Sequence, residues 1–239
     1  MRPVDLGGRI VHNWLFSAPG GYVLVDTGYE NGYPALFRAL DRRGLSPADL
    51  SYVFLTHAHD DHAGFLNELL RHSGVKVILS PKAAAGLKRG QNSFEGGCAG
   101  RLALFFCKLM ALAGKGAHRF PPVEGAFADR LLFADEASKP ALERILGGRI
   151  LETPGHTDCS ISLLLEDGTL FCGDAAMNGL PSLHRTTIWV GDKEAYRRSW
   201  EEIIALEPAS IYPGHGAPFS AADLARYLPS LEGLKLYPL

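Results

Sequence analysis

A short run of histidine and aspartate residues constrains the fold of this chain more than any other feature. Residues 52–56 are β-rich and mostly apolar, as expected of a strand buried on both faces, and the chain continues His57-Ala-His59-Asp-Asp61-His62. His57 and His59 are two residues apart, so in extended backbone both rings project to the same side. Asp61 and His62 come at the turn into the next predicted helix and can face the same point from another direction. Because imidazole and carboxylate groups are the usual ligands of zinc and similar divalent ions, this run predicts a metal site.

Three more candidate ligands lie further along the chain, each directly after a predicted strand. His156 lies in the run Thr-Pro-Gly-His-Thr-Asp, Asp174 in Phe-Cys-Gly-Asp, and His215 in Tyr-Pro-Gly-His-Gly. Strand ends and the loops beyond them are where layered α/β proteins build their sites. We therefore interpret these residues as belonging to the same site as the first run.

Predicted strands alternate with predicted helices over most of the chain, which is typical of an α/β layered domain. The opening reads as a β-hairpin, with Pro19, Gly20 and Gly21 between two apolar runs. A chain of 239 residues is long enough for one domain with a sizeable core. Helices are expected over residues 34–43, 63–72, 193–206 and 221–227, and further strands over 75–79, 149–153, 160–166, 169–172 and 210–212.

Residues from about 81 to 142 depart from this alternation, since they are rich in glycine and contain an apolar helix predicted over 102–113. We expect a helical, lid-like insertion within a single domain spanning residues 1–239. The helix is too hydrophobic to be freely exposed, and two roles stay open for it. It packs in the core or against a second copy of the chain in a homodimer, or it lines the pocket. If the helix lines the pocket, Phe105 and Phe106 would contact an acyl chain or another apolar part of the substrate.

Composition argues against several classes of protein. The 24 basic and 26 acidic residues give a formal charge of −2, which offers no electrostatic attraction for nucleic acid. The most apolar stretch, 102–113, is too short to cross a membrane and is interrupted by Lys108. The opening residues lack the apolar run of a secretory signal, and the four cysteines form no CxxC pair, so we expect reduced thiols in a cytoplasmic protein. The expected partner is a small-molecule substrate.

Taken together, the motifs resemble the metal-binding signature of the metallo-β-lactamase-fold superfamily. The resemblance covers nearly the whole chain and includes Asn13 and the run Val-Asp26-Thr-Gly in the N-terminal hairpin. It implies a four-layer αβ/βα sandwich, in which two mixed β-sheets pack face to face with helices on the outside. It also implies that Asp26 lies close behind the metal ligands.

The resemblance further implies two divalent metal ions, of which zinc is the first expectation, while iron or manganese would also suit the ligands. Three histidines would bind the first ion, an aspartate and two histidines the second, and one aspartate would bridge both. In that order, the ligands are His57, His59 and His156; Asp61, His62 and His215; and Asp174.

The activity implied by the resemblance is that of a metal-dependent hydrolase. A metal-bound, bridging hydroxide would attack the carbonyl of an ester, thioester or lactone, and Asp61 would also receive or orient a proton. The chain looks similar to the glyoxalase II and lactonase groups, whereas true β-lactamases of this fold generally have Cys or Ser in place of Asp174. Two alternatives stay open, namely a persulfide dioxygenase-like enzyme with one iron and a phosphodiesterase. After Asp174, His184 and Arg185 are candidate substrate contacts.

Overall fold

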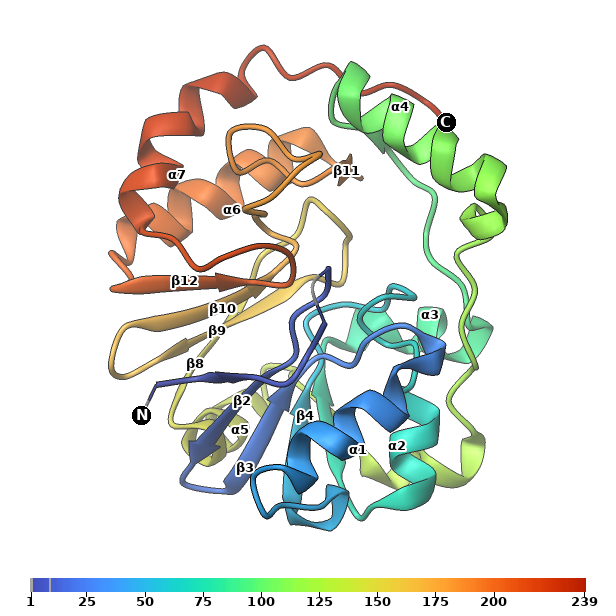
Figure 1. Ribbon diagram of the computed structural model, residues 1–239. Coiled ribbons are helices and arrows are strands. Elements are labelled where there is room, and N and C mark those ends of the chain that lie inside the picture. The colour runs from blue at the N-terminus through green and yellow to red at the C-terminus, as the bar shows by residue number, and fades with distance from the viewer. Residues whose placement is uncertain (1, 9) are drawn as a thin grey trace.

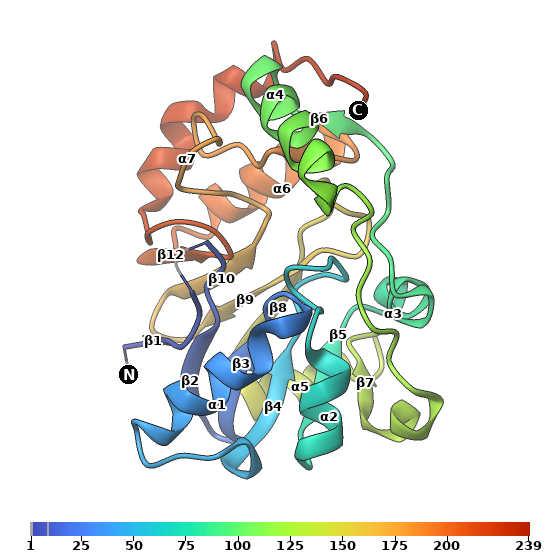
Figure 2. The same ribbon diagram turned by 45° about the vertical axis from the view of Figure 1, so that its right-hand side comes forward.

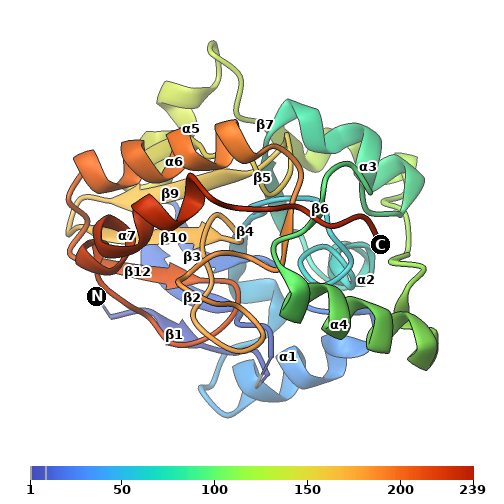
Figure 3. The same cartoon turned by 90° about the horizontal axis from the view of Figure 1, so that it is seen from above.

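Two β-sheets lie face to face, with helices on both outer sides, in the computed structural model, which describes residues 2–8 and 10–239 (Figures 1 and 3). The larger sheet is mixed, and its six strands have the spatial order β1 (Val4–Asp5), β2 (Trp14–Ala18), β3 (Gly21–Val25), β4 (Leu50–Phe54), β5 (Lys76–Leu79) and β7 (Leu131–Phe133). The smaller sheet is also mixed, with the order β12 (Ser210–Pro213), β10 (Thr169–Gly173), β9 (Ile161–Leu165) and β8 (Gly148–Glu152).

Helices cover the outer face of each sheet (Figure 2). On the larger sheet they are α1 (Tyr33–Asp41), α2 (Leu66–His72) and α3 (Ala84–Arg89), and on the smaller sheet α6 (Lys193–Ala205) and α7 (Ala221–Tyr227). The remaining helix of the layers, α5 (Lys139–Leu146), packs Leu142 and Leu146 against the side chains between the sheets. These four layers confirm the predicted αβ/βα sandwich. Short 3₁₀-helices occur at Glu30–Gly32, Pro47–Asp49, Pro81–Ala83, Gly125–Arg130 and Leu228–Leu231.

Apolar side chains from both sheets fill the space between them. Phe16 of β2 stacks on Phe171 of β10, with ring centroids 5.1 Å apart. Val25 and Phe54 from the larger sheet and Leu163 from the smaller one are buried in the same cluster. Their strands are covered by helices on one face and by the other sheet on the opposite face, which is why they read as nearly continuous apolar runs.

The expected insertion at residues 81–142 is narrower in the structure. Within that range α3 buries Leu87 in the core, and β7 pairs in parallel with β5. The part outside the layers is residues 91–119, here called the α4 segment, whose two ends meet where Gln91 bridges Arg119. The segment contains β6 (Gly97–Cys98), which pairs with β11 (Trp189–Val190), then α4 (Arg101–Met110) and a π-helical turn (Ala111–Lys115).

The sequence analysis left open that the apolar helix packs in the core. This is wrong for the outer face of α4, which is exposed. Phe105 is 67% exposed, Leu112 in the following turn is 87% exposed, and Leu102 and Leu109 are also exposed. Within α4 only Ala103 is buried. Among the residues that the structure describes, no helix combines the length and the apolar character that crossing a membrane requires.

The two faces of α1 provide a direct test of this layering. Leu40 is fully buried under the larger sheet, whereas Phe37 on the same helix is 48% exposed. We expect Leu40→Ala to lower the free energy of unfolding by about 2–5 kcal/mol, because it leaves a cavity in a close-packed core. Phe37→Ala should cost less than about 1 kcal/mol. Urea unfolding followed by circular dichroism measures both, and equal losses would contradict the described packing.

Candidate metal centre

The predicted ligands lie in loops that follow four strand ends at one edge of the sandwich. The first run of histidines and aspartates follows β4 of the larger sheet, while His156 follows β8, Asp174 follows β10 and His215 follows β12 of the smaller sheet. A backbone hydrogen bond of 2.9 Å from Ile161 N to Thr56 O connects the two sheets at this edge. Residues separated by more than a hundred positions in the sequence therefore meet where the two sheets face each other.

Two glycines let these loops approach each other closely. At Gly214, directly before a ligand, an added Cβ would lie 2.5 Å from Cε1 of His62 and 2.9 Å from Oδ1 of Asp174. At Gly173 the backbone has a φ of +51°, and an added Cβ would lie 2.4 Å from Oγ1 of Thr56. Any side chain at either position would push the ligand loops apart. The Gly-His and Gly-Asp pairs of the sequence are thus required by the packing of the centre.

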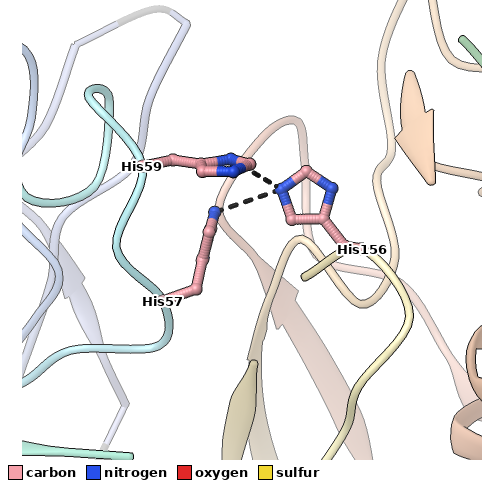
Figure 4. A group of neighbouring side chains, drawn as sticks. All are labelled: His57, His59 and His156. Atoms are coloured by element: carbon pink, nitrogen blue, oxygen red, sulfur yellow. Dashed lines mark hydrogen bonds between the residues drawn. The ribbon is translucent and has the colours of Figure 1, made fainter. Parts of the chain in front are cut away.

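Three histidines form the first group of ligand atoms (Figure 4). The Nε2 atom of His156 lies 3.2 Å from Nε2 of His57 and 2.9 Å from Nδ1 of His59. Nitrogen ligands about 2.0–2.1 Å from a tetrahedral zinc ion lie roughly 3.3 Å from one another. All three nitrogens lie within 4.8 Å of one another, which is compatible with a single metal ion between them.

A second group lies beside the first and consists of Asp61, His62 and His215. The Oδ2 atom of Asp61 is 3.2 Å from Nε2 of His215, and its Oδ1 atom is 3.8 Å from Nε2 of His62. Two imidazole nitrogens and a carboxylate again form a set that suits a divalent ion.

Asp174 lies between the two groups, with one carboxylate oxygen toward each. Its Oδ2 atom is 3.7 Å from Nε2 of His156 in the first group. Its Oδ1 atom is 3.4 Å from Nε2 of His62 and 3.5 Å from Nε2 of His215 in the second group. The structure thus brings all seven predicted ligands together, and a third group of possible ligands, made of His57, His62 and Asp174, overlaps the other two. The assignment of each ligand to one ion stays a prediction.

Hydrogen bonds on the far side of the rings orient the histidines. The Nδ1–H groups of His156 and His215 donate to the backbone carbonyls of Trp189 and Ile10, each at 2.7 Å. In His57 the Nδ1 atom lies 3.0 Å from Oγ1 of Thr56. With a proton on Nδ1, each ring presents its Nε2 lone pair to the centre, as a metal ligand requires.

Asp26 performs the same task for His62 and also connects two strand ends. Its carboxylate is 1% exposed, and its Oδ2 atom accepts from Nδ1 of His62 and from Oγ1 of Thr56, both at 2.7 Å. Its Oδ1 atom accepts from the backbone N–H of Thr56, also at 2.7 Å. The residue has a φ of +58°, which few side chains tolerate. The sequence analysis expected Asp26 just behind the ligands, and it lies there.

The protonation of four buried ligands, His57, His59, Asp61 and Asp174, fits metal binding. Burial and the neighbouring histidines hold the pKa values of His57 and His59 well below the ordinary value, so both rings are neutral. Burial opposes ionisation of Asp61 and Asp174, but the surrounding histidines keep the pKa of each below its ordinary range. Neutral imidazoles and ionised carboxylates are the forms that coordinate a metal ion.

Two observations indicate that a positive charge would stabilise the group of buried ligands. Burial opposes protonation of His215, yet Asp174 and Asp61 raise its pKa to about 9. Among the described side chains, the buried polar atoms without a hydrogen-bond partner are His59 Nε2, His62 Nε2 and Asp174 Oδ1. A buried polar atom left without a partner costs about 1–3 kcal/mol, and a divalent ion between His62 and Asp174 would satisfy both. The residues present therefore fit the expected metal ions.

The sequence analysis missed a small cluster at the rim of the centre. The carboxylate of Asp60 accepts from Nδ2 of Asn92 at 2.7 Å and from Nδ1 of His118 at 3.3 Å. Since Asn92 and His118 belong to the α4 segment, this cluster ties the segment to the first run of ligands. Beside it, a cavity of about 210 Å³ adjoins His59 and has a mainly polar lining, which includes Arg89.

The candidate substrate contacts have other partners in the structure. The guanidinium of Arg185 donates to Asp223 at 2.7 Å, and His184 stacks on Tyr227 with ring centroids 5.0 Å apart. Phe105 lies on the exposed face of α4, whereas Phe106 is partly buried. Contact of these four residues with a substrate stays a prediction.

Comparisons with known proteins agree with this geometry. The family model described as "Metallo-beta-lactamase superfamily" matches residues 6–215, which include all seven ligands. The chain belongs to the metallo-beta-lactamase superfamily. It is 31% identical over 216 residues to the "Metallo-beta-lactamase fold-containing protein ST1585" of Sulfurisphaera tokodaii, an alignment that covers 87% of this chain and 74% of that protein.

Two further likenesses concern a curated relative and a solved structure. It is 29% identical over 199 residues to a "Hydroxyacylglutathione hydrolase" of Cereibacter sphaeroides, covering 82% of this chain but only 58% of that protein. A solved metallo-beta-lactamase of Cronobacter sakazakii with a HARLDQ motif superposes with a TM-score of 0.67 at 24% identity, over 97% of this chain and 88% of that one. The second likeness concerns the fold alone.

Asp26→Asn tests whether the contacts behind the ligands matter for the metal. This change removes the negative charge that orients His62, and outer-sphere partners typically contribute 10–100-fold to metal affinity. We expect zinc to bind the second position about 10–100-fold more weakly, measured by competition with a chromophoric chelator. Asp5→Asn is the matched control, since Asp5 pairs with His12 at 2.6 Å outside the ligand set. Equal zinc affinity in all three proteins would show that Asp26 does not position a ligand.

Proposed function

We propose that this chain is a hydrolase that binds two divalent metal ions, most readily zinc, and cleaves an ester, a thioester or a lactone. The observation that carries the proposal is the position of Asp174, which directs one carboxylate oxygen toward each of two complete ligand groups. A site for a single ion would not need the second group. Membership of the superfamily and the relatives described as metallo-hydrolases support the same class of reaction.

The chain's own residues prepare the reaction. When bound, the ions would lower the pKa of a water molecule toward neutrality and polarise the carbonyl oxygen of the substrate. Asp174 sets the separation of the two groups, and Asp26 fixes the ring of His62. Asp61 has an oxygen toward each histidine of the second group, and its side chain is 17% exposed, so it would also receive or orient a proton during turnover.

The choice among carbonyl substrates follows from the ligand set and from one relative. Asp174 stands where the superfamily's true β-lactamases generally carry Cys or Ser, which argues against a β-lactam. The relative described as a hydroxyacylglutathione hydrolase acts, by that description, on an acylglutathione. A thioester is therefore the first substrate class to test, followed by lactones and simple esters.

Metal content tests the proposal most directly. Elemental mass spectrometry on protein purified without added metal should find about two equivalents of zinc, iron or manganese per chain. Removal with a chelator should abolish hydrolysis and lower the melting temperature, because ligands that bind only the folded state stabilise it, and added zinc should restore both. One equivalent of iron, with turnover of persulfides, would favour the dioxygenase alternative. Turnover of phosphodiesters, with no turnover of esters, thioesters or lactones, would favour the phosphodiesterase alternative.

Asp61→Asn separates the role of this carboxylate from a general effect on the loop. We expect the turnover of a thioester or lactone to fall by about 10²-fold or more, since the variant loses both a metal ligand and a proton acceptor. Asp60→Asn is the matched control, because the neighbouring Asp60 contacts Asn92 and His118 and no ligand group includes it. If both variants turn over substrate like the unmodified enzyme, Asp61 has neither role.

A further inference from the structure

The outer face of α4 presents an unusual row of exposed apolar side chains. Leu102, Phe105, Leu109 and Leu112 are 43%, 67%, 53% and 87% exposed. Their spacing of three, four and three residues places them along one face of a helix. The buried Ala103 lies on the opposite face, which packs on the body of the protein. The row therefore faces away from the core rather than into it.

The exposed apolar surface continues beyond the helix. A small cavity between the beginning of α4 and the loop at residues 181–188 is lined by both Leu102 and Leu183. Leu183 is 54% exposed, and Leu180 in the same loop is 84% exposed. In three views of the molecule, α4 lies at its periphery (Figures 1, 2 and 3). Large contiguous apolar surfaces of this kind normally mark a site of interaction.

Basic residues accompany the apolar row, whereas α4 itself contains no acidic residue. Arg101 and Lys108 are exposed and directly precede Leu102 and Leu109, so they lie beside the row. Residues 96–123 contain four basic residues and no aspartate or glutamate, although the whole chain has a formal charge of −2. Exposed lysine and arginine therefore lie beside the apolar row on α4, and the nearest acidic residues in the sequence are Glu95 and Glu124.

We infer that the outer face of α4 docks onto the surface of an anionic lipid membrane. An amphipathic helix with apolar residues on one face and lysine or arginine beside them lies in the plane of the interface and inserts its apolar face among the lipids. Basic residues close to an anionic bilayer add electrostatic attraction to this apolar insertion. This is peripheral binding, and no part of the chain needs to cross the bilayer.

The charges distinguish the membrane from two other occupants. If a second copy of the chain packed α4 against α4 by two-fold symmetry, Arg101 and Lys108 of both copies would lie beside the contact. Like charges in such a contact oppose association. Nucleic acid would match the basic residues but would leave side chains such as Phe105 and Leu112 without an apolar partner. An anionic bilayer satisfies both the apolar and the basic part of the surface.

Co-sedimentation of the purified full chain with lipid vesicles tests the inference. We expect binding to vesicles of phosphatidylcholine with about one third phosphatidylglycerol, and little binding to phosphatidylcholine alone. Binding should weaken as salt increases toward about 1 M, because the Debye length then shrinks to about 3 Å. The double variant Phe105→Ser with Lys108→Glu should bind the anionic vesicles at least about tenfold more weakly.

The matched control is the double variant Phe37→Ser with Arg38→Glu, which changes an exposed aromatic residue and an exposed basic residue on α1 instead. It should bind vesicles like the unmodified chain, and both variants should keep their metal content. Failure to bind anionic vesicles would overturn the inference, as would binding that the α4 variant does not weaken. Sedimentation velocity tests for a dimer, and a DNA-binding assay tests for a DNA complex. If the chain does not bind vesicles but forms a dimer or a DNA complex that the α4 variant abolishes, the inference of membrane binding is also overturned. Metal content decides the proposed hydrolase independently of these outcomes.

Discussion

The buried carboxylate of Asp26 is the interaction on which the arrangement of the centre depends. It accepts hydrogen bonds from the backbone and the side chain of Thr56 at the end of β4, and from the ring of His62. Hydrogen bonds to a charged group contribute about 1.5–3 kcal/mol each, more than neutral ones. Since the group is almost fully removed from water, its charge is tolerable only while these donors are in place. The carboxylate therefore holds the end of β3, the end of β4 and one ligand in a single geometry.

The face-to-face packing of the two sheets explains why the centre lies where it does. Every ligand follows a strand, and the strands of both sheets are fixed by the apolar side chains between them, such as Phe16 and Phe171. The first run of ligands comes from the larger sheet, while His156, Asp174 and His215 come from the smaller one. Rigid strands on both sides hold the ligand atoms within a few ångströms of one another, whereas loops on a mobile scaffold would not. The glycine before His215 then allows the loops to come close enough for Asp174 to reach both groups.

The α4 segment departs from the rule that apolar residues lie inside. Its apolar row is too hydrophobic for an ordinary exposed surface, which is why the sequence analysis expected it to be covered. In the structure the face opposite to the row packs on the body, and the Asn92 and His118 contacts with Asp60 tie the base of the segment to the rim of the metal centre. These contacts connect the segment that carries the apolar row to the loop that carries the first run of ligands. On our inference, the exposed apolar side chains of α4 bind the protein to the surface of a lipid membrane.

Much of this protein could be read from the sequence because its signals are local. The alternation of apolar runs predicted most helices and strands of the layers to within a few residues, since periodicity depends only on neighbouring positions. The spacing of His57, His59, Asp61 and His62 likewise predicted a metal site from one short run. The strands β1, β6, β7 and β11 and the helices α3 and α5 were not predicted, because each is short and its own pattern of apolar residues is weak.

Tertiary structure alone decided the features that depend on distant contacts. It determined that Asp174 directs one oxygen toward each group, that Asp60 binds residues of the α4 segment, and that β7 belongs to the larger sheet. It also left the outer face of α4 uncovered, although hydrophobicity by itself predicted burial. The physical reason is the same in each case. A residue's type and spacing determine what it can bind or where it prefers to lie, but only the packing of the whole chain determines which partners lie within reach and which surfaces remain open to solvent.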